Sequence, residues 1–204
     1  LAARCADLLD EGAGRRSALA IAEAFADEGA EYDSATTHSG TVLRVWSLSE
    51  RDSLDRVLGV LGDLVARPRF LRGEFARVRA DRVTEIATWL DDPATVAGLT
   101  LAQALYGREH AYGRPVGGRA ATLRTLRVTD AQAFWRRHYR PDNAALIAVG
   151  AVRAADLLPM LERAFGGWRA PPRAREPAPT APDRPGPRLV IVDRDGAPQS
   201  EVRL

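Results

Sequence analysis

The apolar side chains of this chain recur every three to four residues over several long stretches, which is the spacing of one face of an α-helix. In the stretch that starts at Ser53, Leu54 and Leu61 belong to such an apolar stripe. Ser17 is a suitable N-cap for the first stretch and Gly29 a suitable stop. The pattern predicts helices at 18–28, 53–65, 72–90, 93–106, 129–138 and 154–165.

Other segments have the two-residue alternation or the short apolar run of β-strands. Residues 32–38 and 41–48 are joined by Ser39-Gly40, a turn signal, so they are expected to form a hairpin. Further strands are predicted at 143–149, 188–193 and 200–204. Helices and strands in this order favour an α+β fold, an antiparallel sheet with helices packed on one face, over regular βαβ winding.

The predicted domain organisation follows from composition. Residues 1–170 are expected to form an N-terminal α+β domain, and 171–187 a proline-rich linker with no core of its own. Residues 188–204 are expected to be the first strands of a second, truncated domain. Because Leu1–Leu9 resembles an amphipathic helix already under way, we expect the natural N-terminus to lie upstream.

Charge and cysteine content exclude several classes of function. The 29 basic residues are nearly balanced by 27 acidic ones and form no basic stripe, which argues against nucleic-acid binding. Cys5 is the sole cysteine, so neither a disulfide framework nor a cysteine-rich zinc site is possible. No apolar run is long enough for a membrane span, and no signal peptide is visible. A cytoplasmic location is the default expectation.

The residues by themselves do not point to an active site. The histidines, His38, His110 and His138, are far apart in sequence, and no two have the i, i+4 spacing of a helical zinc site. Each is expected to be a surface or hydrogen-bonded residue. The glycine pairs at 12–14 and 117–118 do not follow a buried strand, so a phosphate-binding loop is not supported.

Several local motifs, taken together and in this order, resemble the insulinase/pitrilysin family, which includes the mitochondrial processing peptidase. They are a Gly turn and helix at 12–29, Ala-Arg-Pro-Arg-Phe at 66–70, Asp-Asp-Pro at 91–93, the loop at 105–115, and His-Tyr-Arg-Pro-Asp-Asn at 138–143 followed by an apolar run. The resemblance covers nearly the whole chain and implies the half-domain fold of these metallopeptidases.

The family's catalytic device is an inverted zinc motif, His-x-x-Glu-His, with a distal glutamate ligand. Alignment on the Gly12 turn places the motif at Ala3–Asp7, where both histidines and the general base are missing. Glu85 falls near the distal ligand position, and it is expected to be either a leftover of the lost site or a salt-bridge partner for the surrounding arginines. The resemblance therefore implies no catalytic residue and no metal ligand in this chain, no activity alone, and zinc only in a partner subunit.

The resemblance also implies a peptide-binding edge strand at 32–36, with Asp33, Ser34 and Ala35 as the candidate contact residues. A plain hairpin edge facing a partner is the alternative. Two functions remain open. The chain is a non-catalytic subunit that encloses peptides with a zinc-bearing paralogous peptidase subunit, or as a homodimer, or it is a structural or assembly domain with no proteolytic role.

Overall fold

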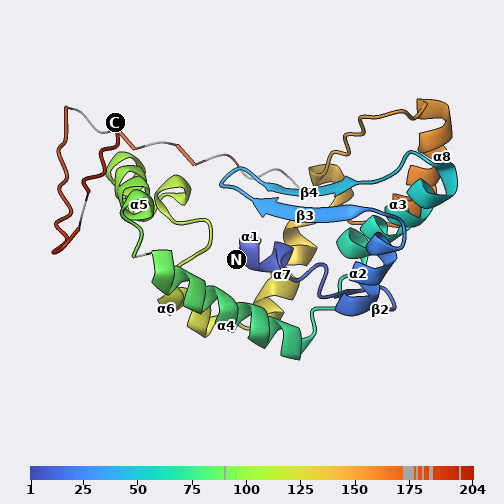
Figure 1. The fold of residues 1–204 in the computed structure, drawn as a ribbon, viewed down its shortest axis with the longest axis horizontal. Coiled ribbons are helices and arrows are strands. Elements are labelled where there is room, and N and C mark those ends of the chain that lie inside the picture. Colours follow the sequence, from blue (N-terminus) through green and yellow to red (C-terminus); the bar gives the residue numbers. More distant parts are fainter. Residues whose placement is uncertain (90, 172–176, 178, 181, 184–185, 198) are drawn as a thin grey trace. The chain divides into compact units, whose positions relative to one another are not determined.

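A computed structural model describes residues 1–89, 91–171, 177, 179–180, 182–183, 186–197 and 199–204. The chain divides into two compact units, and the boundary between them falls inside a long helix. Unit 1 contains Leu1–Val78 and Arg127–Arg173, and unit 2 contains Arg79–Leu126 and Ala174–Leu204. Figure 1 labels the elements, which are in order α1 (Ala2–Ala6), β1 (Gly12–Ala13), β2 (Arg16–Ser17), α2 (Ala18–Ala26), β3 (Glu31–Thr36), β4 (Thr41–Trp46), α3 (Arg51–Ala66), α4 (Arg72–Trp89), α5 (Pro93–Tyr106), η1 (Ala111–Gly113), α6 (Ala120–Thr125), α7 (Val128–His138), η2 (Pro141–Asn143) and α8 (Ala154–Phe165).

The predicted α+β class is confirmed by helices packed beside small antiparallel sheets. In unit 1, β3 pairs with β4 in register, with Asp33 opposite Arg44 and Ala35 opposite Val42 (Figure 1). The predicted turn between them closes with a hydrogen bond from the Thr37 N–H to the Gly40 carbonyl oxygen, 2.8 Å long. A second, shorter hairpin joins β1 to β2.

Helix α2 begins and ends where its sequence signals predict. The Ser17 hydroxyl accepts a hydrogen bond from the Ala20 N–H at 3.3 Å, which satisfies one of the free donors of the first turn. Gly29, with a φ of +58°, supplies the left-handed residue that lets the chain leave the helix and enter β3. On the buried side, the Phe25 ring stacks on the Tyr32 ring with centroids 5.5 Å apart, so α2 covers β3.

The core of unit 1 is built around α1, α3 and α7. Leu8, Leu9 and Leu64 are almost fully buried there, as are Ile21 and Met160. The Trp135 indole N–H of α7 donates to the Val65 carbonyl oxygen of α3 at 2.8 Å, a contact between residues 70 positions apart. Burial of side chains of this size stabilises the fold by about 2 kcal/mol each, before the cost of ordering them.

Unit 2 contains α5, η1 and α6. Asp92 caps α5 by accepting hydrogen bonds from the Ala94 and Thr95 backbone N–H groups. The side chain of Trp89 lies against Gly117, where a Cβ atom would come within 2.2 Å of the indole ring. A hydrogen bond from Arg194 to the Asp91 carbonyl oxygen, 2.8 Å long, attaches the C-terminal segment to this unit. Helix α6 was not predicted.

The strands predicted at 143–149, 188–193 and 200–204 are not strands in the described part of the chain. Residues 141–143 form η2 instead, and the apolar side chains after it are exposed, with Ile147 at 87% and Val149 at 95%. A strand needs a partner for its backbone donors and acceptors, and no described strand pairs with these segments. Much of the predicted linker lies outside the described residues, and the predicted domain boundaries stay a prediction.

Candidate functional site

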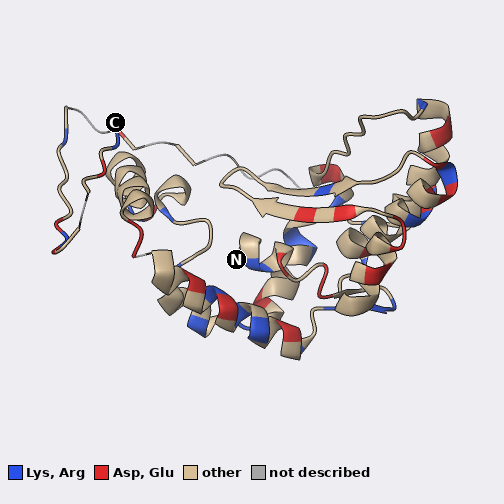
Figure 2. Ribbon diagram, viewed as in Figure 1, with Lys and Arg blue, Asp and Glu red and all other residues tan. Residues whose placement is uncertain are grey.

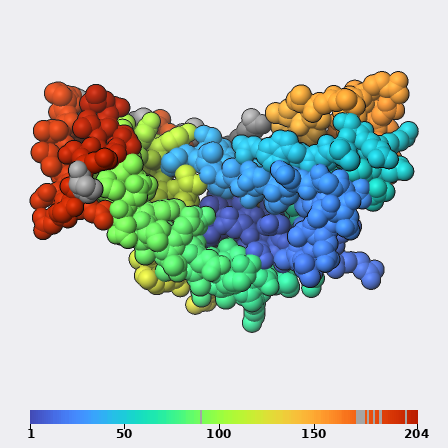
Figure 3. All heavy atoms as spheres, in the orientation of Figure 1, coloured from blue at the N-terminus to red at the C-terminus, as the bar shows by residue number. Residues whose placement is uncertain are grey.

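Helix α1, where the resemblance places the lost motif, is packed as part of the core. Ala3 and Ala6 are 6% and 2% exposed, and Cys5 is fully buried. The helix contacts α7 on one side and β3 and β4 on the other. In Figure 3 only a small patch of the dark blue N-terminal residues is visible below the hairpin. These positions therefore contribute apolar surface to unit 1 rather than side chains to a cleft.

The charged residues of α1 neutralise each other. The Arg4 guanidinium is buried, and it forms an ion pair with the Asp7 carboxylate one helical turn later. A buried arginine beside a carboxylate is the arrangement that the low dielectric constant of a protein interior requires. Asp7, the residue at the position of the second zinc-binding histidine, is thus a partner of Arg4.

The side chains of α1 do not fit a zinc ion. A protein zinc site needs three or four nitrogen, sulfur or oxygen ligands, and Ala3 and Ala6 have none to offer. Burial raises the pKa of the Cys5 thiol to about 12, so it is not a thiolate at neutral pH. Within the ranges that the structure describes, no three His, Cys, Asp or Glu side chains are grouped to hold a metal.

Glu85, at the distal ligand position, lies on α4 in unit 2. Its carboxylate forms an ion pair with Arg82 at 2.6 Å, and its side chain is 48% exposed. The prediction that it serves as a salt-bridge partner is confirmed. Exposed pairs of this kind contribute at most about 1 kcal/mol to folding.

A polar cluster lies where α1 meets β3 and the end of α7. Burial raises the pKa of both Tyr32 and Tyr139, and the Tyr139 hydroxyl lies beside the Cys5 thiol. Asp10, in the turn after α1, has a pKa raised to about 6, first by burial and then by the nearby charges of Glu11 and Asp7. None of the phenols or the thiol is ionised near pH 7, so the cluster holds no activated nucleophile.

Strand β3 has a free edge. It pairs with β4 on one side, and no other described strand pairs with it. Hydrogen-bonded and non-hydrogen-bonded pairs alternate along an antiparallel ladder. Counting from the Thr37–Gly40 hydrogen bond, Ser34 falls in a non-hydrogen-bonded pair, so its backbone N–H and C=O point away from β4. An extended peptide beside β3 would find these groups available.

The structure separates the three residues predicted to contact a peptide. Asp33 is exposed on the outer face of the hairpin, where its carboxylate pairs with Arg44 across the strands at 3.1 Å. Ser34 is half-buried on the inner face, with Tyr32. Ala35 shares the outer face with Asp33. Figure 2 shows the acidic stretch on β3, to which Glu31 also belongs. No finding tests their role in peptide binding, which stays a prediction.

The three histidines lie in different elements, as the sequence predicts. His38 is exposed in the β3–β4 turn. His110 precedes η1 in unit 2, where its Nδ1 accepts from the Tyr112 N–H at 3.2 Å and its ring stacks on Tyr106. His138 ends α7 and packs on the Phe134 ring at 4.3 Å.

Comparison with known proteins agrees with this reading. A family model described as "Peptidase M16 inactive domain" matches residues 125–204. An uncharacterized zinc protease of Mycobacterium bovis is 30% identical over 201 residues, 97% of this chain, as is one of Mycobacterium tuberculosis. Together these matches support an insulinase-type M16 family member, as the sequence motifs predict. A zinc protease of Streptomyces coelicolor, also uncharacterized, is 28% identical over 85% of this chain.

The M16 fold is shared with solved structures. A peptidase M16 inactive domain from Pseudomonas fluorescens superposes over 86% of this chain and 43% of its own, with a TM-score of 0.76 and 24% identity. A protease from Helicobacter pylori does so over 88% of this chain and 43% of its own, with a TM-score of 0.78 and 18% identity. The superposition on pitrilysin covers 88% of this chain and 19% of the pitrilysin chain, with a TM-score of 0.66.

The chain spans 44% of the length of the mycobacterial zinc proteases that it matches. Three observations together support a non-catalytic M16-like domain. They are the inactive-domain match, the shared fold and the absence of the zinc-binding motif from α1. Among the helices that the structure describes, none has the length and apolar character to cross a membrane.

Sequence reasoning missed two features of the site. Tyr139 and Arg140 entered only as part of a family motif. In the structure Tyr139 reaches the Cys5 thiol, and Arg140, 6% exposed, donates two hydrogen bonds to the Asp142 carboxylate and a third to the Pro171 carbonyl oxygen. The His-Tyr-Arg-Pro-Asp-Asn motif thus fixes α7 to α1 and to the end of unit 1. No local pattern indicates the contacts with Cys5 and Pro171, because these two partners are distant in sequence.

Proposed function

We propose that this protein is a non-catalytic M16 subunit that pairs with a zinc-bearing M16 subunit and presents the free edge of β3 to an extended peptide. The observation that carries the proposal is the contrast on two touching elements: α1 has no zinc ligands, whereas β3 keeps an unpaired edge. A chain with this arrangement lacks the means to hydrolyse a peptide through its own α1 but retains backbone groups that can bind one.

The free edge supports peptide binding because it uses main-chain atoms. A peptide that pairs with β3 in antiparallel register would exchange hydrogen bonds with the N–H and C=O of Ser34, and with the same groups of Tyr32 and Thr36. Its alternate side chains would lie beside Asp33 on the outer face or over Tyr32 and α1 on the inner face. Each backbone hydrogen bond adds about 1 kcal/mol, so several are needed for useful affinity.

The test is to mix the purified protein with a zinc-bearing M16 paralogue from the same organism that has an intact His-x-x-Glu-His motif. We expect one complex by size-exclusion chromatography and at least a ten-fold gain in cleavage of a quenched fluorescent peptide over the paralogue alone. No complex and no gain would refute the subunit role, and zinc-dependent cleavage by this protein alone would refute its assignment as non-catalytic.

Ser34→Pro tests the role of the β3 edge separately. Proline removes an N–H that β4 does not use, so the hairpin is expected to persist and the complex to form. The gain in peptide cleavage should fall about ten-fold, mainly through a higher KM. Ser34→Ala, which keeps the N–H, is the matched control and should behave as wild type. An unchanged KM in Ser34→Pro, with the complex intact, would show that peptides do not pair with β3.

A structural or assembly role without proteolysis is the second candidate, and the packing of α1 favours it. Two of the three motif positions, Ala3 and Ala6, and the intervening Cys5 are each under a tenth exposed, so this helix serves unit 1 as ordinary core. If the complex with the paralogue forms but peptide cleavage is unchanged, this role is the better account.

A further inference from the structure

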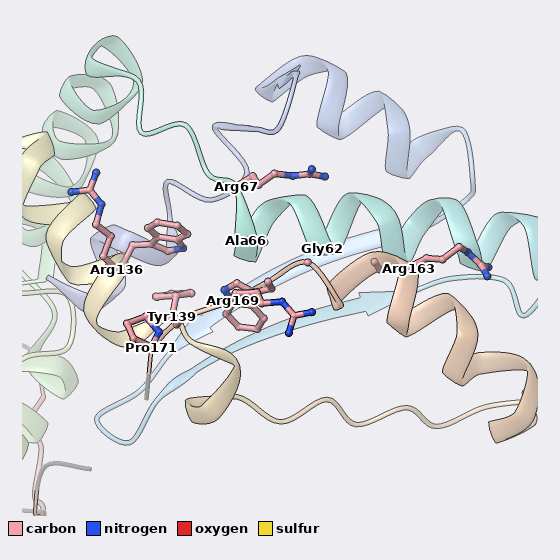
Figure 4. Close-up of a pocket in the computed structure, with 13 residues that line it drawn as sticks. Gly62, Ala66, Arg67, Arg136, Tyr139, Arg163, Arg169 and Pro171 are labelled. Atoms are coloured by element: carbon pink, nitrogen blue, oxygen red, sulfur yellow. The ribbon is translucent and has the colours of Figure 1, made fainter. Parts of the chain in front are cut away.

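Unit 1 holds a cavity of about 400 Å³ between α3, α7 and the segment that follows α8 (Figure 4). Its floor is made of small residues. Gly62 of α3 lies so close to α8 that a Cβ atom there would be 2.4 Å from the Ala164 carbonyl oxygen. With Ala66 and Gly167, this close approach leaves a hollow that longer side chains would fill.

Aromatic rings form the walls of the cavity. Trp135 and Tyr139 line it from α7 and its C-cap, and Trp168 from the segment after α8. The hydrogen bond from Trp135 to Val65 fixes one indole in place, and the Trp168 backbone N–H donates to the Phe165 carbonyl oxygen at 2.8 Å. The Trp135 wall is therefore set before any ligand arrives, which lowers the cost of binding.

All charged residues that line the cavity are arginines. Arg67 pairs with Asp63, and Arg163 pairs with Asp55 at 2.6 Å. In Figure 4 both side chains extend away from the middle of the group. Arg169 lies in the middle, near Tyr139, and Arg136 lies on the other side of Tyr139. Neither Arg136 nor Arg169 has a carboxylate partner in the part of the chain that the structure describes.

This combination selects a particular chemistry. A guanidinium group offers parallel N–H donors that match the two oxygens of a carboxylate, and Arg169 is exposed and so accessible to such a group. The aromatic walls favour an apolar group next to the charge, and a volume near 400 Å³ suits a group the size of one or two amino-acid residues. A bare inorganic anion would leave the rings unused.

We propose that this cavity is a binding site for an apolar carboxylate, either a small acid or the C-terminal residue of a peptide, with Arg169 as its main ligand. The carboxylate pairs with Arg169, and the apolar group lies against Trp168 and Trp135. The site stands apart from β3 and does not depend on peptide pairing there.

The test is calorimetric titration of the purified protein with N-acetylphenylalanine, with N-acetylphenylalanine amide and with inorganic phosphate. We expect the acid to bind at least ten-fold more tightly than the amide and to quench tryptophan fluorescence. Arg169→Gln should abolish the preference for the acid without moving the unfolding midpoint. Arg15→Gln, an exposed arginine in the β1–β2 turn outside the cavity, is the matched control and should leave it unchanged.

Equal affinity for acid and amide, or no binding of either, would overturn the proposal. So would phosphate that binds as tightly as the acid, or Arg15→Gln that loses as much affinity as Arg169→Gln. The source of the carboxylate is distinguished by N-acetyl-Leu-Leu-Phe. A tripeptide acid that binds more tightly than N-acetylphenylalanine indicates a peptide C-terminus, and one that binds more weakly indicates a small acid.

Discussion

Helix α1 and strand β3 touch in unit 1, yet they differ in what the chain has kept. The resemblance places the catalytic motif on α1, but Ala3 and Ala6 stand where a ligand and a general base would lie. The resemblance predicts peptide binding at β3, and one edge of β3 pairs with no other described strand.

The comparison of α1 with β3 indicates which functions a chain can lose by substitution of side chains. Zinc binding depends on a few side chains of defined chemistry, so replacing them removes it while the helix persists. Strand pairing depends on the N–H and C=O groups that every residue except proline carries. The edge of β3 is therefore tolerant of sequence change, whereas Ala3 and Ala6 of α1 contribute only buried apolar surface.

The largest expected effect comes from returning a charge to α1. Ala6→Glu restores the residue type of the general base in a position that is 2% exposed. A buried, unpaired carboxylate that also overpacks the core is expected to lower the free energy of unfolding by about 3 kcal/mol or more. Chemical denaturation followed by circular dichroism measures it.

Ala35→Glu, on the outer face of β3, is the matched control for this comparison. Its carboxylate can reach water, so the expected loss is under about 1 kcal/mol. Equal losses for the two variants would mean that α1 is not core and that its comparison with β3 is wrong.

A smaller effect is expected at Asp10, which lies where the two regions meet. Its carboxyl faces Glu11 and Asp7, which raise its pKa, Arg77, which lowers it, and the Tyr32 phenol. Because the folded pKa of about 6 exceeds the ordinary value of 3.8, the folded state holds this proton more tightly. The resulting stabilisation is complete below about pH 3.8 and is lost as the pH rises through about 6.

Asp10→Asn removes this titration. The variant is expected to be more stable than wild type at pH 7 by roughly 1–3 kcal/mol, with the difference vanishing near pH 4. Urea unfolding of both proteins at several pH values gives the difference directly, so other carboxylates cancel. If the difference in unfolding free energy between the two proteins did not change from pH 4 to pH 7, the pKa of Asp10 would not be raised by folding, and its carboxyl group would be in contact with water.

The smallest effect concerns the outer face of β3. The Asp33–Arg44 pair is about half exposed on both sides, so its coupling energy in a double-mutant cycle with alanine is expected to be about 0.2–1 kcal/mol. The coupling should shrink in 0.5 M salt. A coupling energy above about 2 kcal/mol would mean that this face is shielded from water, and the description of β3 as an exposed strand with a free edge would be wrong.

Much of the local structure could be predicted from residues alone, because each signal acts within one turn. Ser17, Gly29 and Asp92 set helix ends through contacts with their neighbours, and the Ser39-Gly40 turn set the hairpin. The apolar run after Asn143 failed as a predictor, because a strand exists only when another segment supplies its backbone partners. The apolar run at 188–193 failed for the same reason.

The sequence alone determined the family resemblance, the location of most helices and the absence of the His-x-x-Glu-His motif at positions 3–7, since each depends on residue identity at known spacing. Only the tertiary structure decided that α1 is buried, that Tyr139 meets Cys5, that β3 keeps an open edge and that arginines and tryptophans enclose a cavity beside Gly62. Those features join residues many positions apart. Their physical cause is packing, and packing is a property of surfaces that meet only when the chain has folded.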